Sequence, residues 1–199
     1  MWKWPERSNT IGEVPKVLKV PVVLVPEVAG VWETDMTKTT DVAQDRSLRE
    51  HVLYLLREGG AHVGFDDAIE GLPANLRGTA PEGLPYSPWQ LLEHMRIAQW
   101  DIVEFSRNAN HKSPEWPRGY WPDSPAPPSP EAWDKSVEAF RADLKTMEKL
   151  VEDPSTDLFA RIPWGDGQTI LREALLVADH NAYHLGELVV VRRLLGAWR

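Results

Sequence analysis

The sequence of 199 residues contains no cysteine. This absence excludes disulfide bonds, a cysteine nucleophile and thiolate ligands. Any transition-metal site in the protein must therefore be built from His, Asp and Glu side chains. A chain that uses no disulfides also suits a reducing compartment, so we expect a cytoplasmic protein.

Positive charge is also scarce, because 22 Lys and Arg residues stand against 30 Asp and Glu, for a formal net charge of −8. Phosphate groups repel an acidic surface, so nucleic acid and anionic membranes are not expected partners. Long apolar runs are missing as well. The most apolar stretch, residues 17–26, is too short to span a bilayer and is interrupted by Pro21.

Residues 1–38 differ in composition from the remainder of the chain. Their prolines forbid a continuous helix, so we expect an irregular extension or a non-native start, with Met36 as the natural first residue. Regular patterning begins just after this methionine. With 42% hydrophobic residues in the whole chain, residues 39–199 are expected to form one domain with a sizeable core.

Apolar residues recur at helical spacing in four segments. The first covers residues 41–58, with an expected buried face of Val42, Leu48, Val52, Leu55 and Leu56. The second opens on Ser87-Pro88-Trp89-Gln90, which has the pattern of a capping box. The third begins at Ser129-Pro130-Glu131, with Ser129 as the cap, and stops at Asp153. Its apolar residues form the seam expected of a bundle helix, namely Trp133, Val137, Phe140, Leu144, Met147 and Val151. The fourth runs from about Gln168 to Leu195.

A Pro-rich segment, residues 108–130, separates the second and third expected helices. Its prolines make a helix impossible over most of its length, and its aromatic residues indicate a loop that packs against the domain as a wall over a pocket. The expected fold is therefore all-α, a four-helix bundle with this loop between helices two and three.

The last expected helix carries His180, His184 and Glu187 on one face, because each residue advances the helix by about 100°. The same face is otherwise apolar, so these side chains are expected to point inward, where an unpartnered imidazole is costly. A divalent metal ion is one partner that removes the cost. Hydrogen bonds from the imidazoles to carbonyl or carboxylate groups are the other.

His94 and Asp101 lie on the apolar face of the second expected helix. If this face meets that of the last helix in a bundle, three histidines converge. The remaining histidines have simpler interpretations. We expect His51 at the boundary of the core, His62 in a hydrogen bond at a helix N-terminus, and His111 solvated in the loop.

The residues Leu91-Leu92-Glu93-His94, together with the stretch from Asp179 to Glu187, resemble the DinB-like (DinB/YfiT) family of metalloenzymes. The resemblance covers residues 39–199 and implies a four-helix bundle with a metal site formed by His94, His180 and His184. Similar proteins usually have Gln where this chain has Glu187. Glu187 is expected to act as a fourth ligand, as an orienter of a ligand or as a general base, or to be solvated at the mouth of the bundle.

Characterised relatives in that family include transferases that use a low-molecular-weight thiol, such as bacillithiol or mycothiol, and a thiol-dependent isomerase. The resemblance implies a metal-dependent thiol S-transferase in detoxification or stress response. Asp101 would orient His94, and Glu187 or Tyr183 would assist proton transfer. Imidazole ligands accept Zn, Ni, Fe and Mn alike. A metal-dependent hydrolase and a non-catalytic metal- or ligand-binding bundle are the alternatives, and family habit suggests a homodimer.

Overall fold

The computed structural model describes residues 33–198 of the chain. Most of the predicted N-terminal extension, residues 1–32, lies outside this part. The long helices are α1 Glu33–Glu58, α3 Pro88–Arg107, α4 Ala132–Glu152 and α5 Ile170–Leu194, and the short ones are α2 Phe65–Ile69, η1 Ala74–Leu76 and η2 Arg118–Tyr120. Within residues 33–198 the β structure is limited to one isolated bridge, between Arg161 and Thr169. The predicted all-α fold is confirmed.

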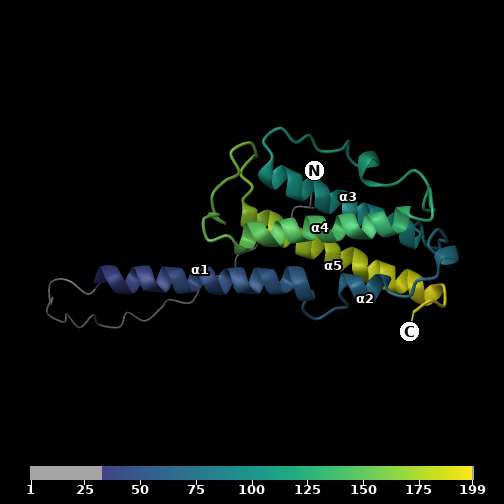
Figure 1. Ribbon diagram of the computed structural model, residues 1–199, viewed down its shortest axis with the longest axis horizontal. Coiled ribbons are helices and arrows are strands. Elements are labelled where there is room, and N and C mark those ends of the chain that lie inside the picture. Colours follow the sequence, from purple (N-terminus) through teal and green to yellow (C-terminus); the bar gives the residue numbers. More distant parts are fainter. Residues whose placement is uncertain (1–32, 199) are drawn as a thin grey trace, which may run out of the picture.

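Helices α3, α4 and α5 lie side by side, and α1 packs against α4 and α5 through its C-terminal half (Figure 1). Val52 and Leu56 of α1 are buried there, as predicted. Val42, in contrast, is 65% exposed and Leu55 is 42% exposed. The predicted face was wrong at these two positions. Val42 lies in the N-terminal part of α1, which extends beyond the other helices, and Leu55 lies in the packed part but on its exposed side.

The start of α3 follows the predicted capping box. The hydroxyl oxygen of Ser87 accepts a hydrogen bond from the backbone N–H of Gln90, and the Gln90 side chain accepts one from the backbone N–H of Ser87. Two backbone donors of the first turn are thereby satisfied. The cap fixes where α3 begins, and with it the height of His94 in the bundle.

The predicted cap of α4 was wrong. The helix begins at Ala132 with Glu131 as its N-terminal flanking residue, and no side chain caps it. Ser129 instead belongs to a preceding turn, in which its carbonyl oxygen accepts from the N–H of Ala132. Helix α5 begins two residues later than expected. Thr169 caps it, with a hydroxyl oxygen that accepts from the N–H of Arg172.

The core lies between the helices, along the predicted seam of α4. Trp133, Val137, Phe140, Met147 and Val151 are all buried on α4, and they face Leu91 and Met95 of α3 and Ala174, Val177 and Leu188 of α5. Burial of these side chains provides the main favourable free energy of folding. None of the helices in the described part of the chain is long and apolar enough to cross a membrane.

A chain of buried amides links three helices. The Gln99 side chain on α3 donates to the carbonyl oxygen of Phe140 on α4 at 2.6 Å and accepts from the Asn181 side chain on α5 at 2.9 Å. A buried amide is stable only when it is hydrogen-bonded, so these contacts restrict how the helices can rotate. Asn181 directly follows His180, so these hydrogen bonds also restrict the direction in which the His180 side chain points.

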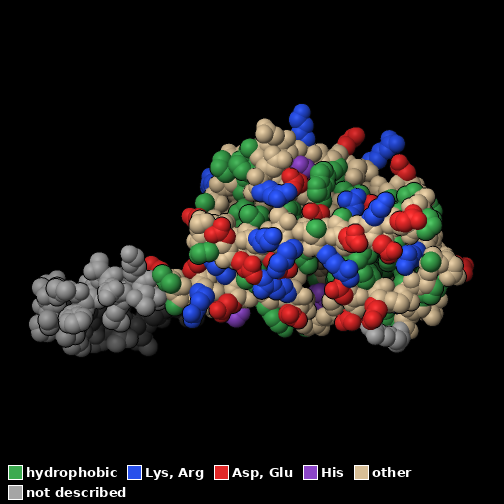
Figure 2. Space-filling view, viewed as in Figure 1, with side chains coloured by type: hydrophobic (Ala, Val, Ile, Leu, Met, Phe, Trp, Pro, Cys, Tyr) green, Lys and Arg blue, Asp and Glu red, His purple; other side chains and the backbone are tan. Residues whose placement is uncertain are grey.

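The outer surface is charged but not of one sign. Figure 2 shows Lys and Arg side chains interspersed with Asp and Glu over the face where α4 lies. Arg141 of α4 pairs with Asp66 of α2, and Lys145 pairs with Glu148 within α4. The Arg141–Asp66 pair is exposed on both sides and contributes little stability.

Candidate metal centre

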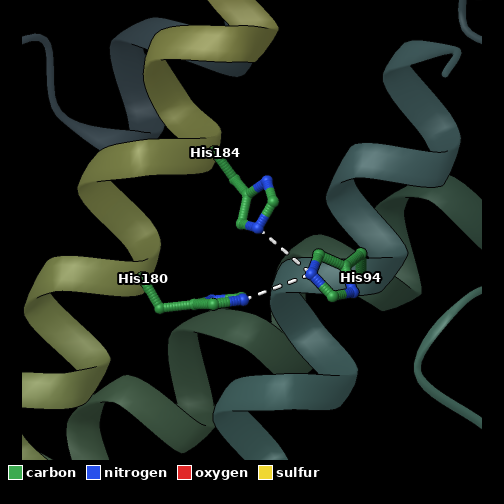
Figure 3. A group of neighbouring side chains, drawn as sticks. All are labelled: His94, His180 and His184. Carbon is green, nitrogen blue, oxygen red and sulfur yellow. Dashed lines mark hydrogen bonds between the residues drawn. The ribbon is translucent and has the colours of Figure 1, made fainter. Parts of the chain in front are cut away.

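Three histidine side chains meet between α3 and α5 (Figure 3). The Nε2 atom of His94 lies 3.1 Å from Nε2 of His184 and 3.2 Å from Nε2 of His180. The candidate ligand atoms of the three residues all lie within 4.8 Å of one another, an arrangement that could hold a metal ion. The predicted convergence of the two helix faces is therefore confirmed.

The geometry follows from the two helices. His180 and His184 are one turn apart on α5, so their rings stand above one another on the side that faces α3. His94 enters from α3 between them. His94 is only 4% exposed and His184 only 8% exposed, so two of the three rings are removed from bulk water.

The second nitrogen of His94 is held by the loop between α3 and α4. Nδ1 of His94 lies 2.9 Å from the carbonyl oxygen of Tyr120. A carbonyl oxygen only accepts, so Nδ1 carries the proton and Nε2 is left with a free lone pair in the neutral ring. The next loop residue, Trp121, stacks on His94 with ring centroids 3.9 Å apart and an angle of 3° between the planes.

The second nitrogen of His184 is held by Glu187. The distance from Nδ1 of His184 to Oε2 of Glu187 is 2.7 Å, and Glu187 also accepts a hydrogen bond from the Tyr183 hydroxyl. Glu187 thus lies behind His184, where its geometry corresponds to the orienting role among those considered for it. Burial raises the pKa of Glu187 above its usual range. Tyr183 is 65% exposed and meets the His184 ring edge-on.

The buried Nδ1 atom of His180 has no hydrogen-bond partner among the described residues. Its other nitrogen, Nε2, lies 3.2 Å from Nε2 of His94. Burial, followed by the nearby His184 and His94, lowers the pKa of His180 to about 3. The imidazole is therefore neutral at pH 7.

The hydrogen bonds of His94 and His184 leave lone pairs that a metal ion could bind. His94 and His184 both have their protons on Nδ1, so their Nε2 atoms face each other as two lone pairs that cannot bond to one another. Protonation would relieve the conflict, but burial lowers the pKa of His94 and brings that of His184 to about 4. A divalent cation would accept the lone pairs without any added proton.

Asp101 was predicted to orient His94, but in the structure Tyr120 lies between these two residues. Its carboxylate accepts from the Tyr120 hydroxyl at 2.5 Å and lies 2.7 Å from Nε2 of His111. Tyr120, rather than Asp101, contacts His94. Asp101 therefore anchors the loop segment whose carbonyl group holds the ring.

The prediction of a solvated His111 was wrong, because its side chain is only 6% exposed and pairs with Asp101. The loop folds back along α3, where the buried carboxylate supplies a partner for the imidazole (Figure 1). His51 is exposed, and Nδ1 of His62 lies 2.9 Å from the carbonyl oxygen of the adjacent Val63. Neither of these two joins the cluster.

Sequence reasoning missed Tyr120 and Trp121 as parts of the site. The aromatic residues of the loop predicted that it would pack against the bundle, but an irregular backbone has no periodicity that assigns a partner to each side chain. A backbone carbonyl that accepts a hydrogen bond from a histidine leaves no signal in the sequence, because every residue has such a carbonyl. Only the three-dimensional path of the loop reveals it.

The model of the DinB superfamily matches residues 61–188, which run from just before α2 to the last turns of α5 and contain all three histidines. A comparison with curated proteins and another with solved structures give no significant match. The match covers more than half of the chain, and the chain belongs to the DinB superfamily.

Proposed function

We propose that the protein is a metal-dependent enzyme that transfers a low-molecular-weight thiol to an electrophile, in detoxification or stress response. The observation that carries the proposal is the meeting of the Nε2 atoms of His94, His180 and His184. Zn, Ni, Fe and Mn are the candidate ions, since imidazole suits them all. Three protein ligands are the number typical of catalytic sites, whereas structural sites are usually closed by four.

A divalent ion held by His94, His180 and His184 would leave a position open for substrate and would lower the pKa of a thiol bound there. The sulfur must come from a cosubstrate, because the chain has no cysteine. In the proposed reaction the sulfur forms a bond to the electrophilic carbon. The bond from that carbon to its leaving group breaks with its electron pair, and the thiol proton passes to solvent.

The protein's own residues prepare the site for this reaction. The Tyr120 carbonyl and the Glu187 carboxylate keep the protons of His94 and His184 on Nδ1, which leaves each Nε2 free to bind. Trp121 covers one face of the His94 ring and keeps water from it. Tyr183 is exposed, and its hydroxyl donates a hydrogen bond to Glu187 and so helps to fix the carboxylate behind His184.

The first test is the metal content of the purified full-length protein. Elemental analysis is expected to find close to one divalent ion per chain, and His180→Ala is expected to lose it. Addition of the ion should raise the melting temperature of the wild-type protein but not that of the variant. No metal in the wild-type protein, even after reconstitution, would defeat the proposal.

The second test is turnover with and without thiol. The metal-loaded protein is expected to consume cysteine or another small thiol in the presence of chloroacetamide, and His184→Ala is expected to abolish this activity. Ester or amide hydrolysis without any thiol would favour a hydrolase instead. Equal rates for the wild-type protein and His184→Ala would count against catalysis at this site.

A further inference from the structure

An apolar pocket of about 310 Å³ has in its wall Glu187, the carboxylate that contacts His184. The aliphatic side chains of Leu91 on α3 and of Val190 and Val191 on α5 line it, together with the Tyr86 ring. Among the described residues that line it, Glu187 is the only charged one. Val190 is 48% exposed, so apolar surface there is left facing the pocket and solvent.

Two residues of the pocket wall connect it to two of the histidines. Glu187 contacts Nδ1 of His184 at 2.7 Å. Tyr86 stacks on Trp121 with ring centroids 4.0 Å apart, and Trp121 stacks in turn on His94. A molecule in the pocket would therefore lie one or two side chains away from the cluster, by two independent routes.

Gly186 supports a role for the empty space. It lies in the interior of α5, where glycine is a poor helix former compared with alanine. A Cβ atom built at Gly186 would meet nothing within 4 Å, so no close packing contact requires glycine there. The residue also lines the pocket. The helix thus lacks a side chain at the point where one would occupy the pocket.

We propose that this pocket binds the apolar part of the electrophilic substrate, an uncharged aryl or alkyl group, and so selects the substrate class. The inference rests on the proposed transferase function for the identity of the substrate, but not for the binding itself. The pocket has no cationic lining residue and has a carboxylate at one side, which disfavours carboxylate and phosphate groups. Substrates with those groups would therefore bind poorly.

The binding test uses 2-naphthylmethanol, which is uncharged and unreactive, and 2-naphthoate as its anionic control. Titration of the metal-loaded full-length protein, followed by calorimetry or ligand-observed NMR, is expected to show binding of the alcohol and at least about tenfold weaker binding of the carboxylate. Gly186→Leu should weaken binding of the alcohol by about tenfold or more. The leucine side chain would occupy part of the pocket, and the ligand would lose burial equivalent to about two methylene groups. Equal affinity for the alcohol in this variant would overturn the proposal.

Two further variants separate pocket filling from unfolding. Arg193→Leu introduces the same residue at an exposed position of α5 that does not line the pocket, and should bind the alcohol as the wild-type protein does. Val190→Asn introduces a polar group at a half-exposed pocket position, where folding tolerates it, and should weaken binding. Unchanged binding in Val190→Asn would also contradict the proposal, whether or not Gly186→Leu folds.

Turnover distinguishes failure of this inference from failure of the proposed function. With a thiol present, 2-(chloromethyl)naphthalene should have a lower KM than chloroacetamide, and Gly186→Leu should raise only the KM of the naphthyl substrate. Turnover of both with no such difference would leave the transferase and remove the pocket's role. Binding of 2-naphthylmethanol that Gly186→Leu abolishes, without turnover of either chloride, would leave the pocket and remove the transferase.

Discussion

The Nδ1 atom of His94 lies 2.9 Å from the carbonyl oxygen of Tyr120, 26 residues further along the chain. The contact joins α3 to the Pro-rich loop before α4. Helix α3 sets the position of the His94 backbone, but the loop sets the orientation of the ring and determines which ring nitrogen carries the proton. The loop is therefore a part of the candidate metal centre and not simply a connection.

Asp101→Asn is expected to weaken metal binding by roughly 10- to 100-fold, the usual effect of losing an outer partner of a metal ligand. The amide would be a poorer acceptor for the Tyr120 hydroxyl and for His111, so the loop would hold the Tyr120 carbonyl less firmly. Competition with a metal-binding dye measures the change. Glu138→Gln, an exposed carboxylate on α4, is the control and should bind metal as the wild-type protein does. Equal affinities for both variants would mean that Asp101 has no influence on the site.

Glu187→Gln is expected to bind metal less tightly than the wild-type protein but more tightly than Glu187→Ala. The amide oxygen of Gln still accepts from Nδ1 of His184 but lacks the negative charge, whereas Ala provides no acceptor. Metal affinities of the three proteins, measured in the same competition assay, give the order. If Glu187→Gln were as weak as Glu187→Ala, the charge of Glu187 would matter more than its position behind His184.

The metal-free protein is expected to lose stability as the pH falls from about 7 to about 4. Burial lowers the pKa of His180 to about 3 and that of His184 to about 4, below the ordinary value of about 6.5 that applies to the unfolded chain. The unfolded chain therefore takes up protons first. The stability that depends on these neutral rings is fully present above about pH 6.5 and falls as the pH approaches their folded pKa values.

Urea unfolding of the metal-free protein at a series of pH values measures this dependence. His180→Ala removes one of the buried imidazoles. The slope of its unfolding free energy against pH should therefore correspond to up to about one proton fewer than the slope of the wild-type protein. His51→Ala, at an exposed position of α1, should keep the wild-type dependence. An identical slope in His180→Ala would show that His180 is not buried as a neutral ring.

The parts of the fold that the sequence predicts correctly are those set by local chemistry. The Ser87 cap, the seam of α4 and the shared face of His180 and His184 each follow from residues within a few positions of one another. Where the backbone took another path, prediction failed. Ser129 is a residue type that commonly caps helices, but it lies in a turn before α4. Val42 has the spacing of a core residue, but it lies where α1 has no neighbouring helix.

The environment of the histidines depends on longer-range contacts. The approach of α3 to α5 could be inferred because both helices carry polar residues on faces that are otherwise apolar. The pairing of Asp101 with Tyr120 and His111 could not, since these side chains meet only after residues 108–121 fold back over α3. The stacking of Tyr86, Trp121 and His94 likewise involves three separate segments with no common periodicity.

The buried amides of Gln99 and Asn181 have a consequence for how the centre comes together during folding. Gln99 lies five residues after His94, and Asn181 adjoins His180, so docking of α3 on α5 brings the amides and the imidazoles into place in one event. The bond from Gln99 to Phe140 adds α4 to the same event. Native-state hydrogen exchange should therefore show the backbone amides around these residues opening together, with bound metal slowing the exchange of all three helices and not of α5 alone.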